Sequence, residues 1–147
     1  MHRDLRLETI EVFETELQPL DMRVQLKSMH KAVQLESKTQ RLYDDLEGLQ
    51  FCAPEIFNKQ IGHSLAADEY AIGVLAFYLF SGMKDYPCKI PLFLTDDLEI
   101  YEHLREAKLD FQKPVWDQYR FGKQIKQVIS GLLKFDDSQR MTASQAL

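Results

Sequence analysis

Residues 66–80 read AADEYAIGVLAFYLF, and this segment dictates how the rest of the chain must pack. Apart from Asp68 and Glu69 the segment is continuously apolar, and a helix that is apolar on all sides belongs in the core of a domain. Gly82 follows it as a stop signal, because glycine commonly stands just after a helix. The sequence therefore predicts a buried helix over 66–80, around which the flanking segments pack.

The composition indicates one ordinary globular domain. A chain of 147 residues buries roughly 68–70% of its unfolded surface, and a hydrophobic content of 45% with 28% charged residues is typical of folded proteins. The net charge of −5, with Lys and Arg scattered along the chain, favours neither nucleic acid nor an anionic membrane as a partner. The longest apolar stretch, 70–80, falls well short of the about 20 residues that a membrane-spanning helix needs.

Cys52 and Cys88 are the only cysteines, and their spacing does not match a metal site. The histidines His30, His63 and His103 show no ligand spacing either. We therefore expect that these residues form no metal site. We also expect that both thiols are reduced and that the protein is cytoplasmic.

Ahead of the buried helix, two short strands and a loop are predicted. Alternating residues favour strands over 10–13 and 22–26, separated by a polar turn around Gln18 and Pro19. The stretch 36–50 has no clear period and is typical of an exposed loop.

Behind the buried helix, capping signals predict further helices. Thr95-Asp96-Asp97 predicts the start of a helix that runs to about Leu109 and carries one apolar stripe of Ile100, Leu104 and Ala107. Apolar residues at helical spacing over 125–133 predict another helix. Residues 142–145, TASQ, have the form of a capping box and predict a last one.

Four motifs occur in a recognisable order. Residues 2–9 read HRDLRLET, against the pattern H-R-D-L-x-x-x-N; residues 53–55 read APE; residues 68–74 read DEYAIGV, against D-x-W-S-x-G-V; and residues 136–142 read DDSQRMT, against D-P-x-x-R-x-T. Together they make the chain resemble the C-terminal lobe of a eukaryotic-type serine/threonine protein kinase. A stretch at 111–117, FQKPVWD, is similar to a segment of calcium/calmodulin-dependent kinases.

The resemblance implies a mainly α fold with a few short β-strands and no N-terminal lobe. It divides the chain into a catalytic loop with short strands at 1–34, an activation-segment-like loop at 35–55 and a helical subdomain at 56–147. No G-x-G-x-x-G loop, no V-A-I-K lysine, no partner glutamate helix and no helix before the catalytic loop can be found in the sequence.

The same resemblance implies a set of structural residues. Glu55 is expected to pair with Arg140, which joins the activation segment to the last helices. Asp68 is expected to accept hydrogen bonds from backbone N–H groups of the catalytic loop, and Arg3 of that loop belongs to this structural set.

The catalytic and metal-binding positions match the kinase motifs less well than the structural positions do. By resemblance, Asp4 matches the catalytic base, and Arg6 matches the loop position, usually Lys, that balances charge on the phosphate. Thr9 replaces the Asn that holds the second magnesium ion, and a hydroxyl is a shorter and weaker metal ligand than an amide carbonyl.

Two registers are open for the D-F-G motif, whose Asp holds the principal magnesium ion. One aligns the strand over 24–27 and places Ser28 on the motif, so that an uncharged hydroxyl replaces the carboxylate. The other places Asp21 there, which keeps the carboxylate and loses the preceding strand.

Three hypotheses for function follow. The first is a catalytically impaired lobe, a pseudokinase, that needs no cofactor and binds a protein partner through the helix over 96–109. The second is part of a working serine/threonine kinase that transfers phosphate from ATP with magnesium, completed by a missing N-terminal lobe outside this chain. The third is a truncated product, whose sign would be exposed apolar surface on residues 71–80.

Overall fold

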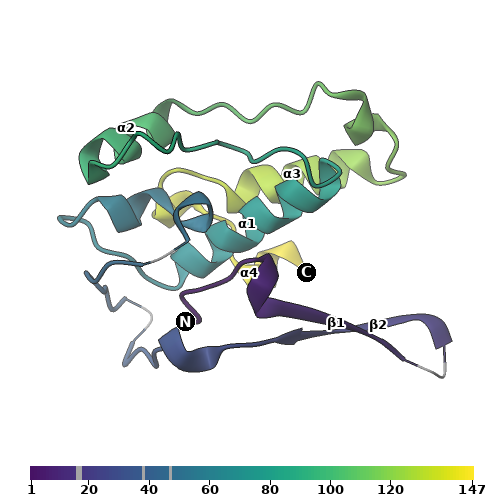
Figure 1. The fold of residues 1–147 in the computed structure, drawn as a ribbon, viewed down its shortest axis with the longest axis horizontal. Helices are drawn as coiled ribbons and strands as arrows, with labels where there is room; N and C mark the ends of the chain where they lie inside the picture. Colours follow the sequence, from purple (N-terminus) through teal and green to yellow (C-terminus); the bar gives the residue numbers. More distant parts are fainter. Residues whose placement is uncertain (16–17, 38, 47) are drawn as a thin grey trace.

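The computed structural model describes residues 1–15, 18–37, 39–46 and 48–147, and it leaves the side chains of 14–22 undescribed. Helix α1 (Ala66–Phe80) runs through the middle of the molecule with the other elements around it (Figure 1). The helix ends as predicted, because Gly82 adopts a φ of 81° and its N–H donates to the carbonyl of Leu79 at 3.1 Å as the chain reverses. The predicted central helix is therefore confirmed, bounds included.

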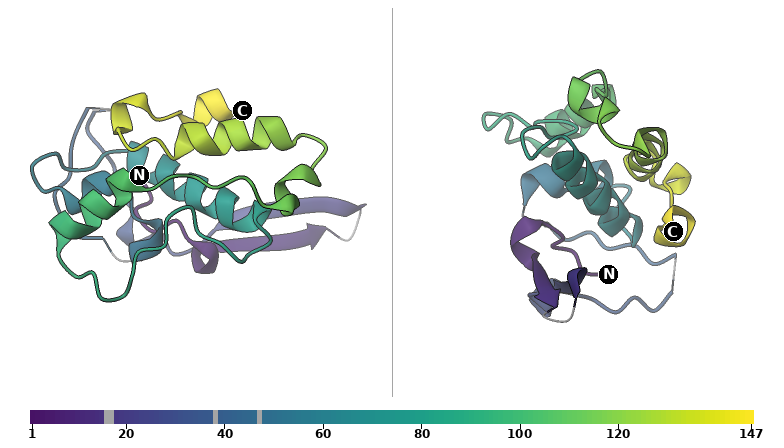
Figure 2. Two further views of the ribbon diagram at one scale, coloured as in Figure 1. Left: turned by 90° about the horizontal axis from the view of Figure 1, so that it is seen from above. Right: turned by 90° about the vertical axis from the view of Figure 1, so that its right-hand side faces the viewer.

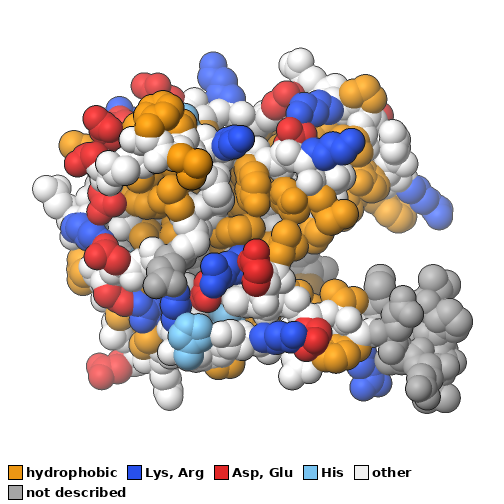
Figure 3. Space-filling view, in the orientation of Figure 1, with side chains coloured by type: hydrophobic (Ala, Val, Ile, Leu, Met, Phe, Trp, Pro, Cys, Tyr) orange, Lys and Arg blue, Asp and Glu red, His pale blue; other side chains and the backbone are white. Residues whose placement is uncertain are grey.

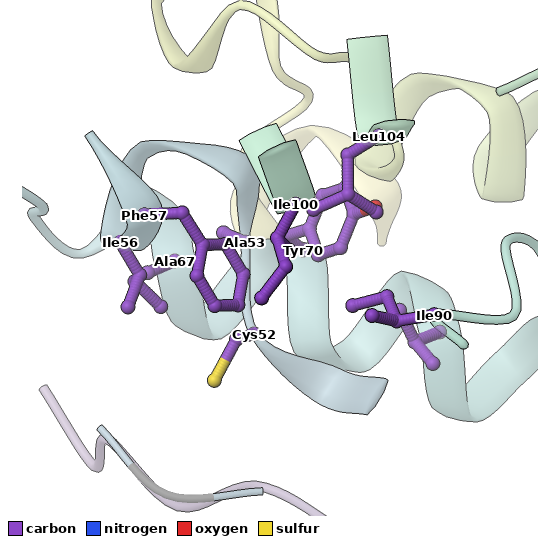
Figure 4. Packing of buried hydrophobic residues seen from close by; sticks show 10 residues of the cluster. Cys52, Ala53, Ile56, Phe57, Ala67, Tyr70, Ile90, Ile100 and Leu104 are labelled. Carbon is purple, nitrogen blue, oxygen red and sulfur yellow. The ribbon is translucent and has the colours of Figure 1, made fainter. Parts of the chain in front are cut away.

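The main core lies between α1 and the segment 52–57. Figure 4 shows buried side chains from these elements and from α2 pointing toward one another. The cluster consists of Cys52, Ala53, Ile56, Phe57, Ala67, Tyr70, Val74, Ile90, Ile100 and Leu104. A helix surrounded in this way is stabilised chiefly by burial of its apolar surface.

Helix α3 (Gly122–Leu132) packs along α1, as both views of the ribbon show (Figures 1 and 2). The approach is close because Gly73 has no side chain: a Cβ there would lie 2.9 Å from the Cβ of Leu132. A second core cluster joins the two helices through Phe77, Trp116 and Ile129.

Helix α2 (Asp97–Glu106) begins where predicted, since the Asp96 side chain accepts hydrogen bonds from the N–H groups of Leu98 and Glu99. The predicted end near Leu109 is wrong, because Ala107 already has an extended backbone (φ −62°, ψ 135°). Ala107 is exposed, so further turns would bury no apolar surface, and packing supplies most of a helix's stability.

The last helix, α4 (Ala143–Ala146), starts with the predicted capping box between Thr142 and Gln145. Short 3-10 helices connect the longer elements: η1 (Leu7–Thr9), η2 (Met29–Lys31), η3 (Leu49–Phe51), η4 (Pro54–Phe57), η5 (Pro114–Asp117) and η6 (Asp137–Gln139). Within the ranges that the structure describes, no helix is long and apolar enough to cross a membrane.

Strands β1 (Ile10–Thr15) and β2 (Gln18–Leu26) form an antiparallel hairpin that projects beside α1 (Figures 1 and 2). The predicted turn at Gln18 and Pro19 is wrong, because both residues lie in β2 and Gln18 already pairs with Thr15. Proline is tolerated there because a two-stranded sheet has only edge strands. The fold is thus mostly helical with a two-stranded sheet, as the resemblance implies.

The stretch predicted as an exposed loop, 36–50, is only partly exposed. Leu42 pairs with His63 through two backbone hydrogen bonds of 2.8 Å, and Leu46 and Leu49 pack against the main core. Lys38 and Glu47 of this stretch lie outside the described residues.

Candidate functional site

The segment 2–9, here called the HRD loop, is fastened to the start of α1. The carboxylate of Asp68 accepts the N–H of His2 at 2.6 Å through Oδ2 and the N–H of Arg3 at 2.8 Å through Oδ1. Arg3 has a φ of 71°, a left-handed conformation that a residue other than glycine adopts only when its surroundings impose it. The expected contact between Asp68 and the loop is present.

Asp4 is buried in the HRD loop, with 5% of its surface exposed. Arg6 Nε lies 3.0 Å from Asp4 Oδ1, but among the described residues neither carboxylate oxygen has a partner with hydrogen-bond geometry. The side chain faces a cavity of about 20 Å³ between the HRD loop, α1 and η3, which has room for about one water molecule. Asp4 therefore keeps its hydrogen-bonding capacity unused, and Arg6 lies beside it.

The hydroxyl of Thr9 closes the HRD loop. It accepts the N–H of Arg6 at 3.1 Å and lies within hydrogen-bonding distance of the carbonyls of Asp4, at 2.7 Å, and Arg6, at 2.9 Å. Thr9 is 3% exposed, so its hydroxyl acts inside the loop. A metal ion bound by this oxygen would compete with the loop's own hydrogen bonds.

Ser28 lies close to the end of the HRD loop, two residues after the end of β2. The N–H of the preceding Lys27 bonds the carbonyl of Thr9 at 2.8 Å. Ser28 has a φ of 61°, is exposed, and its hydroxyl shares a 2.7 Å hydrogen bond with Nδ1 of His30.

The competing residue, Asp21, lies inside β2. It is six positions from Lys27, which corresponds to about 20 Å along an extended strand. Its side chain lies outside the described residues. The backbone thus brings Ser28 to the HRD loop and leaves Asp21 toward the far end of the hairpin.

The residues present at these positions do not fit magnesium. Mg²⁺ in proteins is bound by one or two carboxylates with strict octahedral geometry. Thr9 and Ser28 offer only hydroxyls, and over the described parts of the chain no three His, Cys, Asp or Glu side chains are grouped to hold a metal ion.

Glu55 and Arg140 form a buried bidentate ion pair, as expected. The guanidinium Nη1 and Nη2 donate to the two carboxylate oxygens at 2.6 and 2.9 Å. Arg140 also donates to the carbonyls of Ala66, Lys134 and Phe135 and lies 5.0 Å from the ring centroid of Tyr70. This pair holds the end of the 35–55 segment against the C-terminal part of the chain.

A second charged contact was missed by sequence reasoning. Arg3 forms an ion pair with Asp44 of the 35–55 segment, and Asp44 Oδ1 lies 3.8 Å from Nε2 of the buried His63. No motif contains Asp44 or His63, and the only sequence signal is the acidic pair at 44–45 in a polar stretch. The contact depends on the bridge between Leu42 and His63, which local sequence does not specify.

The buried His63 should make the fold sensitive to acid. Burial and then the positive charge of Arg3 lower the pKa of His63 below its ordinary value, so the folded state favours the neutral imidazole. Its contribution is therefore present above the unfolded pKa of about 6.5 and is lost as the pH falls through the folded value. We expect the His63→Gln variant to lose less stability than the wild type between pH 7 and 5 in urea unfolding; equal losses would contradict this role.

Comparison with known proteins identifies similar sequences. The family model described as "Protein kinase domain" matches residues 1–147. The chain is 27% identical to serine/threonine-protein kinase 33 of Mus musculus, over 100% of this chain and 29% of the relative. It is 29% identical to calcium/calmodulin-dependent protein kinase cmkA of Emericella nidulans, over 100% of this chain and 33% of that protein.

A third relative is calcium/calmodulin-dependent protein kinase type 1B of Homo sapiens, 32% identical over 66% of this chain and 26% of that protein. The chain thus spans only 24–33% of the length of these relatives and of a calcium-dependent kinase of Arabidopsis thaliana.

Proposed function

The chain belongs to the protein kinase domain family, and we propose that it is a catalytically impaired member of that family, a pseudokinase lobe that acts by binding a protein. Phosphoryl transfer depends on positioning and on metal ions that neutralise the phosphate charge. The observation that carries the proposal is the state of the two metal positions. The Thr9 hydroxyl forms hydrogen bonds within the HRD loop. Ser28 offers a hydroxyl, which brings no negative charge to a metal ion.

The remaining catalytic side chains support the same proposal. Asp4 is the residue that would orient an attacking hydroxyl, but only 5% of its surface is exposed. Arg6 would balance the charge of a phosphate, yet its Nε lies 3.0 Å from Asp4. An arginine held this way neutralises the buried carboxylate, which fits a structural role for both residues.

The proposed binding surface is α2 with the segment that follows it, 107–109. The apolar stripe of α2 cannot serve, because Ile100 and Leu104 are buried in the main core. The polar side of the helix stays available, with Arg105 and Glu106 exposed. A partner would therefore contact charged side chains at the end of α2.

The proposal predicts that ATP and magnesium do not stabilise this chain. In a thermal melt, MgCl2 with ATP should shift the Tm by less than about 1 °C, because a ligand stabilises a fold only in proportion to its occupancy. MgCl2 alone and ATP alone serve as controls for ionic effects. A shift of several degrees that requires both would contradict the proposal.

Two variants identify the carboxylate if such a shift appears. Loss of the shift in Asp21→Asn would show that Asp21 supplies the metal ligand. Ser28→Asp restores a carboxylate beside the HRD loop, and a shift gained only in this variant would support the assignment of Ser28 to the metal position.

A second candidate function is part of an active serine/threonine kinase, completed by an N-terminal lobe outside this chain and using ATP and magnesium. The observation that favours it is an uncovered apolar face: Ile72 and Leu79 of α1 are 40% and 49% exposed, and Val12 and Val24 of the hairpin 55% and 67%. Figure 3 shows hydrophobic side chains gathered over α1 in this view. A helix that is apolar beyond its first turn and has one open face is suited to being covered by another segment.

The two candidates differ in a direct assay. Fusion of a kinase N-terminal lobe ahead of Met1 should yield phosphate transfer to a generic serine peptide under the second candidate, and that activity should vanish in Asp4→Asn. Under the pseudokinase proposal the fusion stays inactive even when it folds cooperatively.

A cytoplasmic location is part of the proposal. Neither Cys52 nor Cys88 is in a disulfide, which fits a reducing compartment.

A further inference from the structure

A groove of about 360 Å³ is lined by residues from the ends of α2 and α3 and by Tyr70 of α1. Its apolar floor includes Tyr70, Leu104 and Phe135, and its rim carries the cations Arg105, Lys108 and Lys134. A volume of this size is within the range of about 300–1,000 Å³ that is common for ligand sites. The groove, here called the basic groove, is separate from the HRD loop.

The charges of the basic groove are one-sided. Three of its lining residues are cationic and none is Asp or Glu, although the whole chain has a net charge of −5. Arg105 pairs with Glu102 on the outer side of α2. Among the described residues, Lys108 and Lys134 have no carboxylate within ion-pair distance, and both are exposed.

We propose that the basic groove binds an acidic peptide segment of a protein partner. One large apolar side chain would lie against Tyr70 and Leu104, and carboxylates on either side of it would pair with Lys108 and Lys134. Charge complementarity of this kind selects partners and speeds their association. This inference rests on the proposed binding function and names the chemistry of the partner.

The form of the groove favours a peptide over a small molecule. Its lining comes from 54, 70, 87–88, 104–109 and 130–135, so it is a wide surface depression shared by several segments rather than an enclosed chamber. The exposed cations Arg105, Lys108 and Lys134 line it together with several apolar side chains. Such an arrangement matches a chain with a central apolar residue and flanking charges, whereas a small amphiphile has one charged end.

Cys88 provides a direct probe of occupancy. It lines the groove and is half-buried, whereas Cys52 is buried in the main core and desolvation raises the pKa of its thiol to about 12. Alkylation by iodoacetamide at mildly alkaline pH should therefore modify Cys88 first, and Cys52 serves as the internal reference.

The test uses the full chain and four probes. The hexapeptide Glu-Glu-Leu-Phe-Glu-Glu should protect Cys88 from alkylation and bind in fluorescence anisotropy. Lys-Lys-Leu-Phe-Lys-Lys and Glu-Glu-Ser-Ser-Glu-Glu should do neither. Equal binding of the acidic and basic peptides, or no protection of Cys88 by the acidic one, would overturn the proposal. Protection by dodecanoate alone would overturn it in favour of a small anionic amphiphile.

A pair of charge-reversed variants locates the site. Lys108→Glu with Lys134→Glu should weaken binding of the acidic peptide about tenfold or more, because two attractive contacts become repulsive. Lys84→Glu with Lys123→Glu changes the net charge equally at exposed positions outside the groove and should weaken it less than about twofold at physiological salt. Equal losses in the two variants would contradict the assignment. Unchanged urea midpoints show that both variants fold.

This outcome is independent of the nucleotide test. If the acidic peptide does not bind, the proposal for the basic groove is wrong and the impaired-kinase proposal is unaffected. If ATP with magnesium stabilises the chain, the impaired-kinase proposal is wrong and the proposal for the basic groove is unaffected.

Discussion

Replacement of Arg140 by methionine should lower the free energy of unfolding by about 3–5 kcal/mol, because it leaves the Glu55 carboxylate buried without its partner. Glu55 and Arg140 are 3% and 4% exposed, so water cannot take the place of the lost guanidinium. The carbonyls of Ala66, Lys134 and Phe135 would lose a donor as well. Urea unfolding at neutral pH measures the loss.

Two further variants test the cause of this loss. Lys59→Met removes the cation of an exposed ion pair with Asp45, and such pairs contribute about 0–1 kcal/mol. The double replacement Glu55→Leu with Arg140→Met removes both buried charges and should be more stable than Arg140→Met alone. A loss below about 1 kcal/mol in Arg140→Met would show that the pair contributes no more than a surface contact.

Replacement of Asp68 by alanine should cost about 2–4 kcal/mol, because two backbone N–H groups of the HRD loop lose a charged acceptor. The contacts to His2 and Arg3 are 2.6 and 2.8 Å long. Asp68→Asn keeps one acceptor oxygen and should fall between the alanine variant and the wild type. The rate of hydrogen exchange at the Arg3 amide should rise from the wild type to Asp68→Asn to Asp68→Ala. This local effect would not be seen in urea unfolding alone.

The neighbouring acid gives a matched control. Glu69 also lies in the first turn of α1, so Glu69→Gln removes a similar charge from the helix N-terminus. Its side chain accepts an exposed hydrogen bond from the Ala143 N–H. Glu69→Gln should therefore leave the Arg3 amide unchanged, and faster exchange in this variant would mean that the helix charge, rather than the Asp68 contacts, holds the loop.

Elements with local signals were predictable from the sequence. The apolar run of α1, the Asp96 cap and the capping box at Thr142 each depend on residues within a few positions, and the structure places all three as predicted. The end of α2 and the hairpin turn depend instead on what the chain packs against and on strand register. Local sequence does not contain that information.

The candidate site divides in the same way. Motif spacing placed Asp68 and Glu55 with their partners, since the patterns carry the long-range order of the fold. Motif spacing could not show that the Thr9 hydroxyl forms hydrogen bonds with the backbone of its own loop. A motif gives the residue at a position, whereas the bonds of a hydroxyl depend on backbone geometry within tenths of an ångström.

The ion pair between Arg3 and Asp44 has a consequence for how the 35–55 segment is controlled. The anion at this contact is a side chain encoded in the gene, so it is present from the moment the chain folds. A phosphate, by contrast, is added and removed by other enzymes. The charge through which Arg3 holds this segment is therefore supplied by the sequence itself.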